Sequence, residues 1–455
     1  MSLFGTSGVR GPVGETVTAE LALSIGRAVG SDADRVVVGR DVRESGELLA
    51  SAVATGLREC GADVVDVGVA STPTIARSVG WREADAGIAV TASHNPPEDN
   101  GLKLWSASGR AYDRESLAAV ERRIETDDYA LAAWNGLGSR ETWADAVDRH
   151  VEALAAATSV PGAPSIVVDV GNGTGTVTGR ALRALGCRVQ TLNDHPDGHF
   201  PARPSEPTAA HCATLAEFVA SSDADLGVAH DGDADRLLAV AEDGTVVGGD
   251  ALLAIFARDA AASPGADGAD GARESTVAAP VNTSLAVDDA LAEVGATVSR
   301  TRVGDGFVAE RAADPDAVFG GEPSGAWIWP EETPCPDGPL AACRLAALVA
   351  REGPLSALVE TIPSYPIRRA SVEVDPAEKG AIVERVAAAV ADGAGPDPVE
   401  GVDDRDGLRV DLGDAWYLIR ASGTQPLVRV TAEARDAERA DAVFADARGL
   451  VADLA

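Results

Sequence analysis

Short apolar runs alternate with amphipathic stretches over the first two thirds of the chain. Apolar runs predict strands, and apolar side chains at helical spacing predict helices at Ala19–Val29 and Leu48–Cys60. Strands that alternate with helices are typical of βαβ units in mainly parallel sheets. The predicted strands are Arg35–Val38, Asp63–Val67, Gly87–Val90, Ser165–Val170, Arg188–Leu192, Asp225–Ala229, Leu237–Val240, Thr276–Val281, Thr297–Val303 and Ala317–Phe319.

The pattern changes after about Arg368. It predicts a helix at Ala377–Val390, short strands at Leu408–Leu412, Ala415–Arg420 and Leu427–Ala432, and a final helix. This order is typical of an α+β unit of roughly 90 residues, an ordinary domain size. The sequence therefore predicts an α/β protein: three α/β domains with mixed, mainly parallel sheets, and a smaller C-terminal α+β domain.

Composition indicates where these domains meet. Residues 156–164 are small and contain prolines, and Ile362–Pro366 is also proline-rich, as linkers are. We predict domains at residues 1–155, 156–250, 251–364 and 365–455. The stretch 262–272, rich in Gly, Ala and Asp, is interpreted as a surface loop of the third domain.

Acidic residues dominate the charge of the chain. Its 455 residues carry a formal net charge of −34, from 72 acidic and 38 basic side chains. Such a surface repels nucleic acid phosphates, so we expect no nucleic-acid partner. Counterions in a very salty cytoplasm would screen the self-repulsion, which leads to the hypothesis of a halophilic protein. Lys103 and Lys379 are the two lysines, so arginine carries nearly all the positive charge.

Segments that would direct the chain to a membrane or out of the cell are not evident. No stretch is long and apolar enough for a membrane span, and Met1–Arg10 lacks the apolar core of a secretory signal. The five cysteines are scattered without a C-x-x-C pair, as in a reducing compartment, and they give no zinc signal. We expect a soluble, cytoplasmic protein with no membrane partner, and leave its oligomeric state open.

The most polar loop of the chain follows the apolar run Ala86–Val90. It reads TASHNPP at 91–97 and continues through NGLK at 100–103. Loops at the carboxyl ends of strands carry the chemistry of α/β proteins, and the paired prolines exclude a helix. The hydroxyl of Ser93, with His94 beside it and Lys103 further on, predicts a nucleophile or a phosphate carrier.

A second polar loop, DGDADR at 231–236, lies between two predicted strands. Three carboxylates at such close range repel one another unless a cation binds, and hard oxygen ligands favour Mg²⁺. An EF-hand calcium loop is one rival because Glu242 falls at its twelfth position, but Arg236 stands where that loop needs glycine. A solvated acidic turn is the other rival. The candidate metal ligands are Asp231, Asp233 and Asp235.

Two later loops offer groups suited to a sugar phosphate. In GGEPSG at 320–325, Glu322 and Ser324 can bond to sugar hydroxyls. In RASGTQP at 420–426, arginine, hydroxyl and backbone N–H groups form a plausible phosphate cradle with Arg429. The candidate cradle residues are Arg420, Ser422, Gly423, Thr424 and Arg429. Ordinary turns are the alternative for both loops.

Three glycine-containing loops remain. GTSGVRG at 5–11 and GRDVR at 39–43 carry arginines able to hold phosphate. GNGTG at 171–175 follows a predicted strand but lacks the full G-x-G-x-x-G spacing of a dinucleotide site. We interpret it as a tight strand-to-helix turn, and a nucleotide-dependent dehydrogenase as a poor alternative.

Taken together, these loops resemble those of the α-D-phosphohexomutase family. TSGVRG at 6–11 is similar to its amino-terminal loop, TASHNP to its phosphoserine loop and DGDADR to its magnesium loop. GEPSG is similar to its sugar-recognition loop and RASGT to its phosphate loop. The motifs follow in family order along nearly the whole chain. The resemblance implies four domains around a central cleft, and a phosphoryl transfer between the 6- and 1-positions of a hexose phosphate.

The resemblance also implies a role for each candidate residue. Ser93 would carry a covalent phosphate beside Mg²⁺ held by the three aspartates, with a hexose 1,6-bisphosphate as activator. Arg10, Lys103 and Arg236 would add positive charge, and Lys103 or His94 would transfer a proton. The GEPSG loop would bind the sugar and the RASGT loop the phosphate that is not reacting.

The substrate is less closely specified. TRVGDGFV at 301–308 is most similar to the phosphoglucosamine mutase branch, which interconverts glucosamine 6-phosphate and glucosamine 1-phosphate. A phosphomannomutase/phosphoglucomutase is the alternative. A non-catalytic sugar-phosphate-binding relative is a further one, because Ala326 stands where many relatives have histidine.

Overall fold

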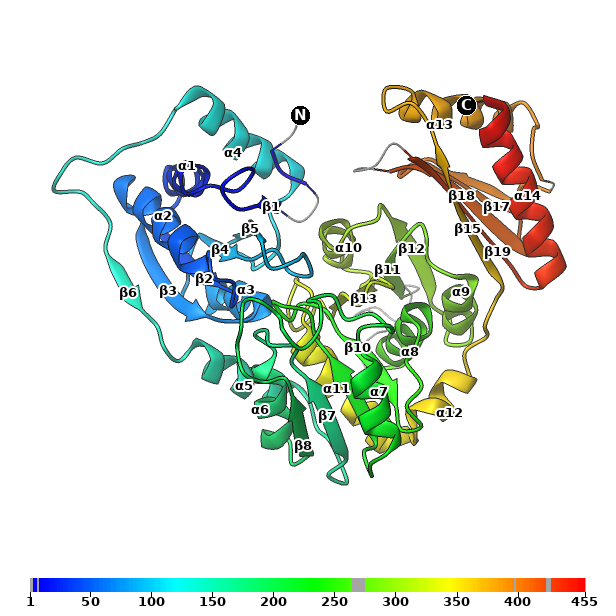
Figure 1. The fold of residues 1–455 in the computed structure, drawn as a ribbon, viewed down its shortest axis with the longest axis horizontal. Helices are drawn as coiled ribbons and strands as arrows, with labels where there is room; N and C mark the ends of the chain where they lie inside the picture. The colour runs from blue at the N-terminus through cyan, green and yellow to red at the C-terminus, as the bar shows by residue number, and fades with distance from the viewer. Residues whose placement is uncertain (1–2, 6–7, 264–274, 397, 423–426, 455) are drawn as a thin grey trace.

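The computed structural model describes residues 3–5, 8–263, 275–396, 398–422 and 427–454. They form four sheets with their helices, which we call domains 1 to 4 in chain order. Figure 1 shows the domains in an arc, with domain 1 on the left, domains 2 and 3 below and in the middle, and domain 4 on the right.

Domain 1 holds a six-stranded sheet of order β1-β5-β4-β2-β3-β6. Its elements are β1 (Val9–Pro12), α1 (Ala19–Gly30), β2 (Arg35–Arg40), α2 (Gly46–Glu59), β3 (Asp63–Val69), α3 (Thr72–Trp81), β4 (Ala86–Val90), β5 (Asp99–Ser106), α4 (Arg114–Thr126) and β6 (Arg140–Thr142). Side chains of β2 alternate between the two faces of the sheet. Val36 and Val38 join the core under α1 and α2, whereas Val37 joins the core under α3, so helices cover both faces.

Domain 2 holds a four-stranded sheet of order β10-β9-β7-β8. Its elements are α5 (Ala146–Ala157), β7 (Ser165–Asp169), α6 (Thr176–Ala184), β8 (Arg188–Leu192), α7 (Ala213–Ala220), β9 (Leu226–Ala229) and β10 (Leu238–Ala241). Strands β8, β7 and β9 are parallel, and β10 is antiparallel to β9. The connection between β9 and β10 is the aspartate loop, which therefore has strands on both sides and not the helices of an EF-hand.

Domain 3 holds a four-stranded sheet of order β12-β11-β13-β14. Its elements are α8 (Gly249–Ala262), β11 (Thr276–Pro280), α9 (Leu285–Ala292), β12 (Thr297–Thr301), α10 (Asp305–Ala312), β13 (Ala317–Gly321), β14 (Trp327–Ile328), α11 (Gly338–Glu352) and α12 (Leu355–Glu360). One hydrophobic core runs through domains 2 and 3. It contains Leu182 and Val228 of domain 2 together with Phe256 and Trp327 of domain 3.

Domain 4 holds a five-stranded antiparallel sheet of order β15-β19-β18-β17-β16. Its elements are β15 (Ile367–Glu373), α13 (Lys379–Ala391), β16 (Gly401–Asp403), β17 (Leu408–Asp411), β18 (Ala415–Ala421), β19 (Leu427–Ala434) and α14 (Ala437–Leu454). Helices α13 and α14 pack on the sheet around a core of its own. A small apolar cluster of Val281, Leu285, Trp416 and Leu418 joins it to domain 3.

The predicted fold class is confirmed, with one local difference that affects the site. The sequence predicts residues 100–103 as part of the polar loop, but they belong to β5, which pairs with β4 on one side and β1 on the other. The polar residues Asn100 and Lys103 interrupt the apolar pattern that would predict a strand. The residues that their side chains contact are remote in sequence, so the sequence alone does not reveal those contacts. Pro12 fits β1 because this strand lies at the sheet edge, where a missing N–H costs little.

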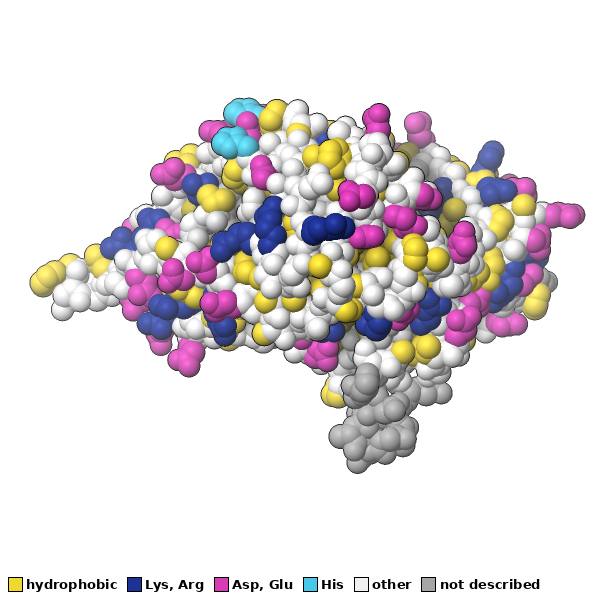
Figure 2. Space-filling view, turned by 90° about the horizontal axis from the view of Figure 1, so that it is seen from below, with side chains coloured by type: hydrophobic (Ala, Val, Ile, Leu, Met, Phe, Trp, Pro, Cys, Tyr) yellow, Lys and Arg dark blue, Asp and Glu magenta, His cyan; other side chains and the backbone are white. Residues whose placement is uncertain are grey.

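The surface mixes the two signs of charge. Figure 2 shows acidic side chains interspersed with arginines, and surface pairs such as Arg351 with Asp259 (2.5 Å) join them. The segment between α4 and β6 projects at the left of Figures 1 and 2 and carries exposed apolar side chains, Leu131, Trp134 and Leu137. Within the described ranges, no helix combines the length and the apolar character that a bilayer span requires.

Candidate active site

Ser93 lies at the carboxyl end of β4, in a strained and buried loop. Its φ of +51° is in the left-handed region, which residues other than glycine rarely adopt. The residue is 1% exposed. Its backbone N–H donates to Thr91 Oγ1 (2.9 Å), and the Thr91 hydroxyl donates to Asp41 Oδ2 (2.7 Å). Backbone strain of this kind persists only where the surroundings hold it in place.

The guanidinium of Arg43 holds that loop in place through hydrogen bonds. This guanidinium donates to Asp41 Oδ2 through Nε and to four backbone carbonyls through its other nitrogens. Those carbonyls belong to Pro96, Asp99, Ser93 and Asn95, at distances of 2.5, 2.8, 2.9 and 2.7 Å. All five donors of the guanidinium are thus bonded within domain 1. The sequence suggested that Arg43 could hold phosphate; the structure makes it a support of the Ser93 loop instead.

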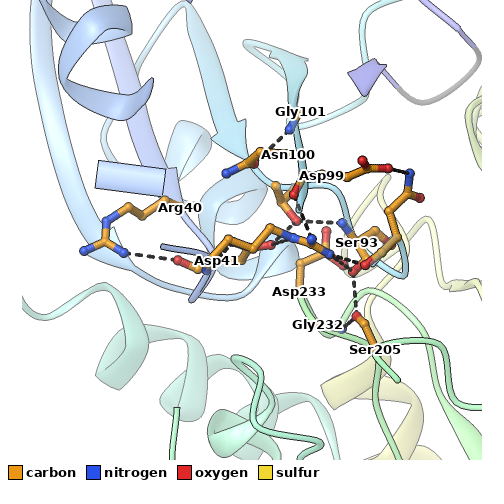
Figure 3. Close-up of polar contacts among 12 residues, drawn as sticks. Arg40, Asp41, Ser93, Asp99, Asn100, Gly101, Ser205, Gly232 and Asp233 are labelled. Atoms are coloured by element: carbon orange, nitrogen blue, oxygen red, sulfur yellow. Dashed lines mark hydrogen bonds and ion pairs between the residues drawn. The ribbon is translucent and has the colours of Figure 1, made fainter. Parts of the chain in front are cut away.

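The Ser93 loop meets the aspartate loop of domain 2 directly. Ser93 Oγ donates to Asp231 Oδ2 at 2.6 Å. Ser205 bridges the two loops, because its hydroxyl donates to the Ser93 carbonyl (2.7 Å) and accepts from the Gly232 N–H (3.0 Å), as Figure 3 shows. A Cβ at position 232 would lie 2.9 Å from the Ser93 carbonyl oxygen, so this close approach requires glycine.

The three aspartates form one buried cluster. Their carboxylates offer oxygens that all lie within 4.8 Å of one another. Burial and the neighbouring carboxylates raise the pKa of Asp231 well above its ordinary value, and raise that of Asp235 as well. Asp233 is opposite: although burial acts to raise its pKa, Lys103 and the Thr72 hydroxyl lower it below the ordinary value.

This cluster fits a divalent cation. Asp233 Oδ1 is buried and has no hydrogen-bond partner within the described ranges, although three carboxylates converge on the same place. Hard oxygen ligands of this kind suit Mg²⁺. Asp231, Asp233 and Asp235 are therefore the residues that would hold the ion, next to the Ser93 hydroxyl.

Lys103 lies among these aspartates, on β5 opposite Ala89 of β4. Its Nζ is 2.9 Å from Asp233 Oδ2 and also pairs with Asp235 Oδ2. Burial acts to lower the pKa of Lys103, but the two carboxylates raise it above its ordinary value. In this arrangement Lys103 is a buried cation, able to neutralise negative charge.

The other predicted cations and His94 lie around the same point. Arg10 is on β1, paired with Gly101, and Arg236 follows the aspartates, with its backbone N–H donating to Asp231 Oδ1 (3.2 Å). Burial, then the charges of Arg236 and Arg10, lower the pKa of His94 to about 3. His94 is therefore neutral near pH 7, and its Nδ1 is 3.4 Å from Ser93 Oγ.

Domain 3 brings its loop to the edge of this cluster. Glu322 is buried and accepts from the Gly304 N–H (2.7 Å) and the Ser324 hydroxyl (3.0 Å). Burial and the nearby charge of Asp305 raise the pKa of Glu322. The charge of Asp305, at the start of α10, also acts to raise the pKa values of Lys103, Asp235 and Arg236. Residue 326, an alanine, is buried and forms a backbone bridge with Arg236.

The predicted phosphate loop of domain 4 is only partly described. Arg420 and Arg429 are cross-strand neighbours on β18 and β19, and Arg420 Nη1 pairs with Asp406 Oδ2 at 3.0 Å. The Ser422 N–H donates to the Leu427 carbonyl (2.8 Å). Gly423 and Thr424 lie outside the described residues.

A cavity of about 960 Å³ lies between domains 1 and 3. Tyr112 and Leu117 line one wall, and Arg302 and Phe307 line the other. Gly306 also lines it.

Sequence reasoning missed several residues that build the site. Thr72 donates its hydroxyl to Asp233 Oδ2 (2.6 Å), Ser205 joins the two loops, and the charge of Asp305 acts to raise the pKa of Asp235. Thr72 and Ser205 are ordinary polar residues with no local pattern, so no signal distinguished them. Asp305 was within the quoted TRVGDGFV segment but was given no role.

The four domains and their joint site define the class of protein. The chain belongs to the phosphoglucomutase/phosphomannomutase family: the family's α/β/α domains I, II and III match residues 1–131, 143–244 and 248–365, and its C-terminal domain matches residues 371–450. The predicted family is confirmed, and with it the class of enzyme, an intramolecular phosphotransferase that acts on hexose phosphates. The family is Mg²⁺-dependent, in agreement with the buried aspartates.

Two relatives and one solved structure show which members of this family the chain is similar to. A probable phosphoglucosamine mutase of Methanopyrus kandleri is 43% identical over 442 residues, covering 96% of this chain and 95% of the relative. A probable phosphoglucosamine mutase of Methanosarcina barkeri is 42% identical over 448 residues, covering 98% and 97%. The crystal structure of a phosphoglucomutase/phosphomannomutase family protein from Burkholderia thailandensis superposes with a TM-score of 0.88 at 29% identity, covering 100% of this chain and 97% of that one.

Proposed function

We propose that the protein interconverts glucosamine 6-phosphate and glucosamine 1-phosphate, with Ser93 as the phosphoryl carrier. The observation that carries this is the 2.6 Å contact between Ser93 Oγ of domain 1 and Asp231 Oδ2 of domain 2. It places a single buried hydroxyl against a cluster of carboxylates suited to a divalent cation. Phosphoryl transfer needs positioning and charge stabilisation more than covalent assistance, and this arrangement offers both.

The chemistry balances as two phosphoryl transfers, one from Ser93 to the sugar and one from the sugar back to Ser93. A free sugar hydroxyl attacks the phosphorus of phosphorylated Ser93, the bond from phosphorus to Ser93 Oγ breaks, and a bisphosphorylated sugar forms. The protein takes up the proton of the sugar hydroxyl and returns one to Ser93 Oγ. The sugar turns over, and Ser93 Oγ accepts the other phosphoryl group, so that the sugar hydroxyl regains a proton. Bound Mg²⁺ would supply Lewis-acid stabilisation of the charge that develops on the transferring group. A hexose 1,6-bisphosphate would act as activator by phosphorylating Ser93 in enzyme that has lost its phosphate.

The surrounding cations would act on the same group. Lys103 is already protonated between two carboxylates and could donate a proton to the leaving oxygen, and Arg10 and Arg236 would add positive charge. His94, neutral at pH 7, could accept a proton but has no strong charge to contribute. We assign the proton transfer to Lys103.

The remaining predicted residues would hold the substrate. Glu322 and Ser324, already bonded to each other, would bind the sugar hydroxyls. Arg420, Ser422 and Arg429, with Gly423 and Thr424 of the same loop, would hold the phosphate that is not reacting. A phosphate clamp on a separate domain allows the sugar to turn over while one end stays bound.

The acidic pair in domain 3 supports an amino sugar. Burial and the charge of Asp305 raise the pKa of Glu322, so the two acidic side chains act on each other beside the proposed sugar loop. The 2-ammonium group of glucosamine would relieve their repulsion, whereas the 2-hydroxyl of glucose or mannose would not. The relatives named as probable phosphoglucosamine mutases agree with this choice.

Substrate comparison and intact mass together test the proposal. We expect a covalent phosphate on Ser93 and a higher kcat/KM for glucosamine phosphate than for glucose or mannose phosphate, measured with Mg²⁺, a hexose bisphosphate and high KCl. In Asp305→Asn the preference for glucosamine phosphate should fall. Preference for mannose or glucose phosphate would indicate a phosphomannomutase/phosphoglucomutase. Sugar-phosphate binding without turnover or Ser93 phosphate would indicate a non-catalytic relative.

A further inference from the structure

Thr72 ties the aspartate loop of domain 2 to domain 1. Its hydroxyl donates to Asp233 Oδ2 at 2.6 Å, and its backbone N–H donates to the Asp233 carbonyl at 2.9 Å. Both residues have no exposed surface. A short hydrogen bond to a charged oxygen is strong in such a dry environment, so the side chain and main chain of Asp233 are both held by the first turn of α3.

The two oxygens of Asp233 are used differently. Oδ2 accepts from Thr72 (2.6 Å) and from Lys103 (2.9 Å), which occupies it from two directions. Oδ1 is buried without a hydrogen-bond partner in the part of the chain that is described. Of the two, Oδ1 is the oxygen left for a cation shared with Asp231 and Asp235.

We propose that Thr72 is a positioning residue for the cation, because it holds Asp233 with Oδ1 directed at the ion and Oδ2 directed away. Residues that orient a metal ligand commonly change metal affinity when they are removed. Thr72 is in the same domain as Ser93, so it also sets the cation loop of domain 2 in register with the hydroxyl that carries phosphate. This inference rests on the proposed function, since it takes the three aspartates as the metal loop.

Metal binding by the full-length chain provides the test. Thr72→Val removes the hydroxyl and keeps the shape and the backbone N–H. We expect its dissociation constant for Mn²⁺, measured by the EPR signal of the free ion, to rise by about 10-fold or more, and Thr72→Ser to stay within about threefold of the wild type. Thr74→Val is the matched control, because Thr74 is buried in the same turn but bonds to Ser71 and His150 instead of an aspartate. Its Mn²⁺ affinity should not change.

Activity separates positioning from a structural role. In Thr72→Val, the Mg²⁺ concentration for half-maximal rate should rise, while the rate at saturating Mg²⁺ should approach that of the wild type. An unchanged Mn²⁺ dissociation constant, or a lower rate at saturating Mg²⁺ with no change in affinity, would overturn the inference. If Thr72→Val does not fold, Thr72→Cys keeps the size with a weaker donor, and wild-type Mn²⁺ affinity in that variant would overturn it equally. Failure of the wild-type chain to bind Mn²⁺ or Mg²⁺ would instead remove the metal loop from the proposed function.

Discussion

The Ser93 end of the candidate site and the phosphate loop of domain 4 are built in different ways. Around Ser93, buried hydrogen bonds cross between domains 1 and 2, through Asp231, Ser205 and Thr72. In domain 4, Arg420 is partly exposed and pairs with Asp406, whose Oδ2 also accepts from the Val303 N–H of domain 3 (3.1 Å). The proposed chemistry thus takes place on a dry, cross-linked part of the molecule, and the proposed phosphate clamp on a more accessible part.

The hydrophobic cores also set domain 4 apart from domains 2 and 3. Domains 2 and 3 share one hydrophobic core, whereas domain 4 has its own and meets domain 3 through a small cluster. A few buried polar contacts strengthen that junction, among them Glu433, which accepts from the Ser284 hydroxyl at the start of α9 (2.7 Å). Preorganised charge is effective where transferring groups must not shift, and a clamp must admit and release its ligand. The difference in construction therefore matches the difference in the proposed roles.

The largest effect is expected at the buried end. Ser93→Ala removes the proposed phosphoryl carrier, so turnover should fall to the background rate while hexose phosphate binding persists through domains 3 and 4. Steady-state kinetics and isothermal titration calorimetry measure the two quantities. Ser106→Ala, a change on β5 away from the aspartates, serves as the control. Substantial turnover in Ser93→Ala would show that the Ser93 loop is not the chemical end of the site.

The next effect concerns the support of the Ser93 loop. Arg43→Met leaves Asp41 buried without its partner, and such a loss costs about 3–5 kcal/mol of unfolding free energy. Chemical denaturation measures it. Arg123→Met, which breaks the exposed pair with Asp32, should cost only about 0–1 kcal/mol. Equal costs in the two variants would contradict the view that the Ser93 loop depends on a buried clamp.

At the accessible end we expect a smaller effect that is confined to binding. Arg420→Ala should weaken hexose phosphate binding by about 1.5–3 kcal/mol, because a charge-assisted hydrogen bond to phosphate is lost. The level of Ser93 phosphorylation should stay the same. Arg439→Ala alters an exposed pair with Asp414 in the same domain and should leave the KM unchanged. A wild-type KM in Arg420→Ala would remove Arg420 from the clamp.

The smallest expected effect is a pH dependence of stability that comes from the buried His150. His150 accepts or donates at Thr74 (2.8 Å) and lies 3.2 Å from Asp337, which also pairs with Arg77. Burial lowers the pKa of His150 although the charge of Asp337 opposes this. His150 therefore binds a proton near pH 6.5 in the unfolded chain but stays neutral at that pH in the folded chain. The free energy of unfolding falls as the pH drops below that value.

The slope of this dependence has an upper limit. One group contributes at most about 1.4 kcal/mol per pH unit. Arg77 and the His150 contact lower the pKa of Asp337 despite its burial, so its stabilising contribution is lost only below about pH 4, outside this window. Unfolding measured at pH 7, 6 and 5 should show a gentler slope in His150→Asn than in the wild type. Identical slopes would show that His150 is not held neutral.

Local sequence patterns predicted much of the fold and of the candidate site. Strand and helix alternation predicted three α/β units and a different fourth unit, because apolar periodicity depends on residues that are neighbours in sequence. The motifs around Ser93, Asp231, Glu322 and Arg420 stood out because their residue types are costly or unusual where they occur. The sequence pattern did not predict the strands β1 and β5, because they are strands through their pairing across the sheet and not through their local composition.

Contacts between remote segments were decided by the folded chain alone. Ser93 and Asp231 are 138 positions apart and meet at 2.6 Å, and Thr72 reaches Asp233 across 161 positions. Arg43 looked like a phosphate ligand, yet its five donors are all bonded to domain 1. A residue's type limits which bonds it can form, but the partner depends on which groups packing brings within about 3 Å, and only the assembled domains settle that.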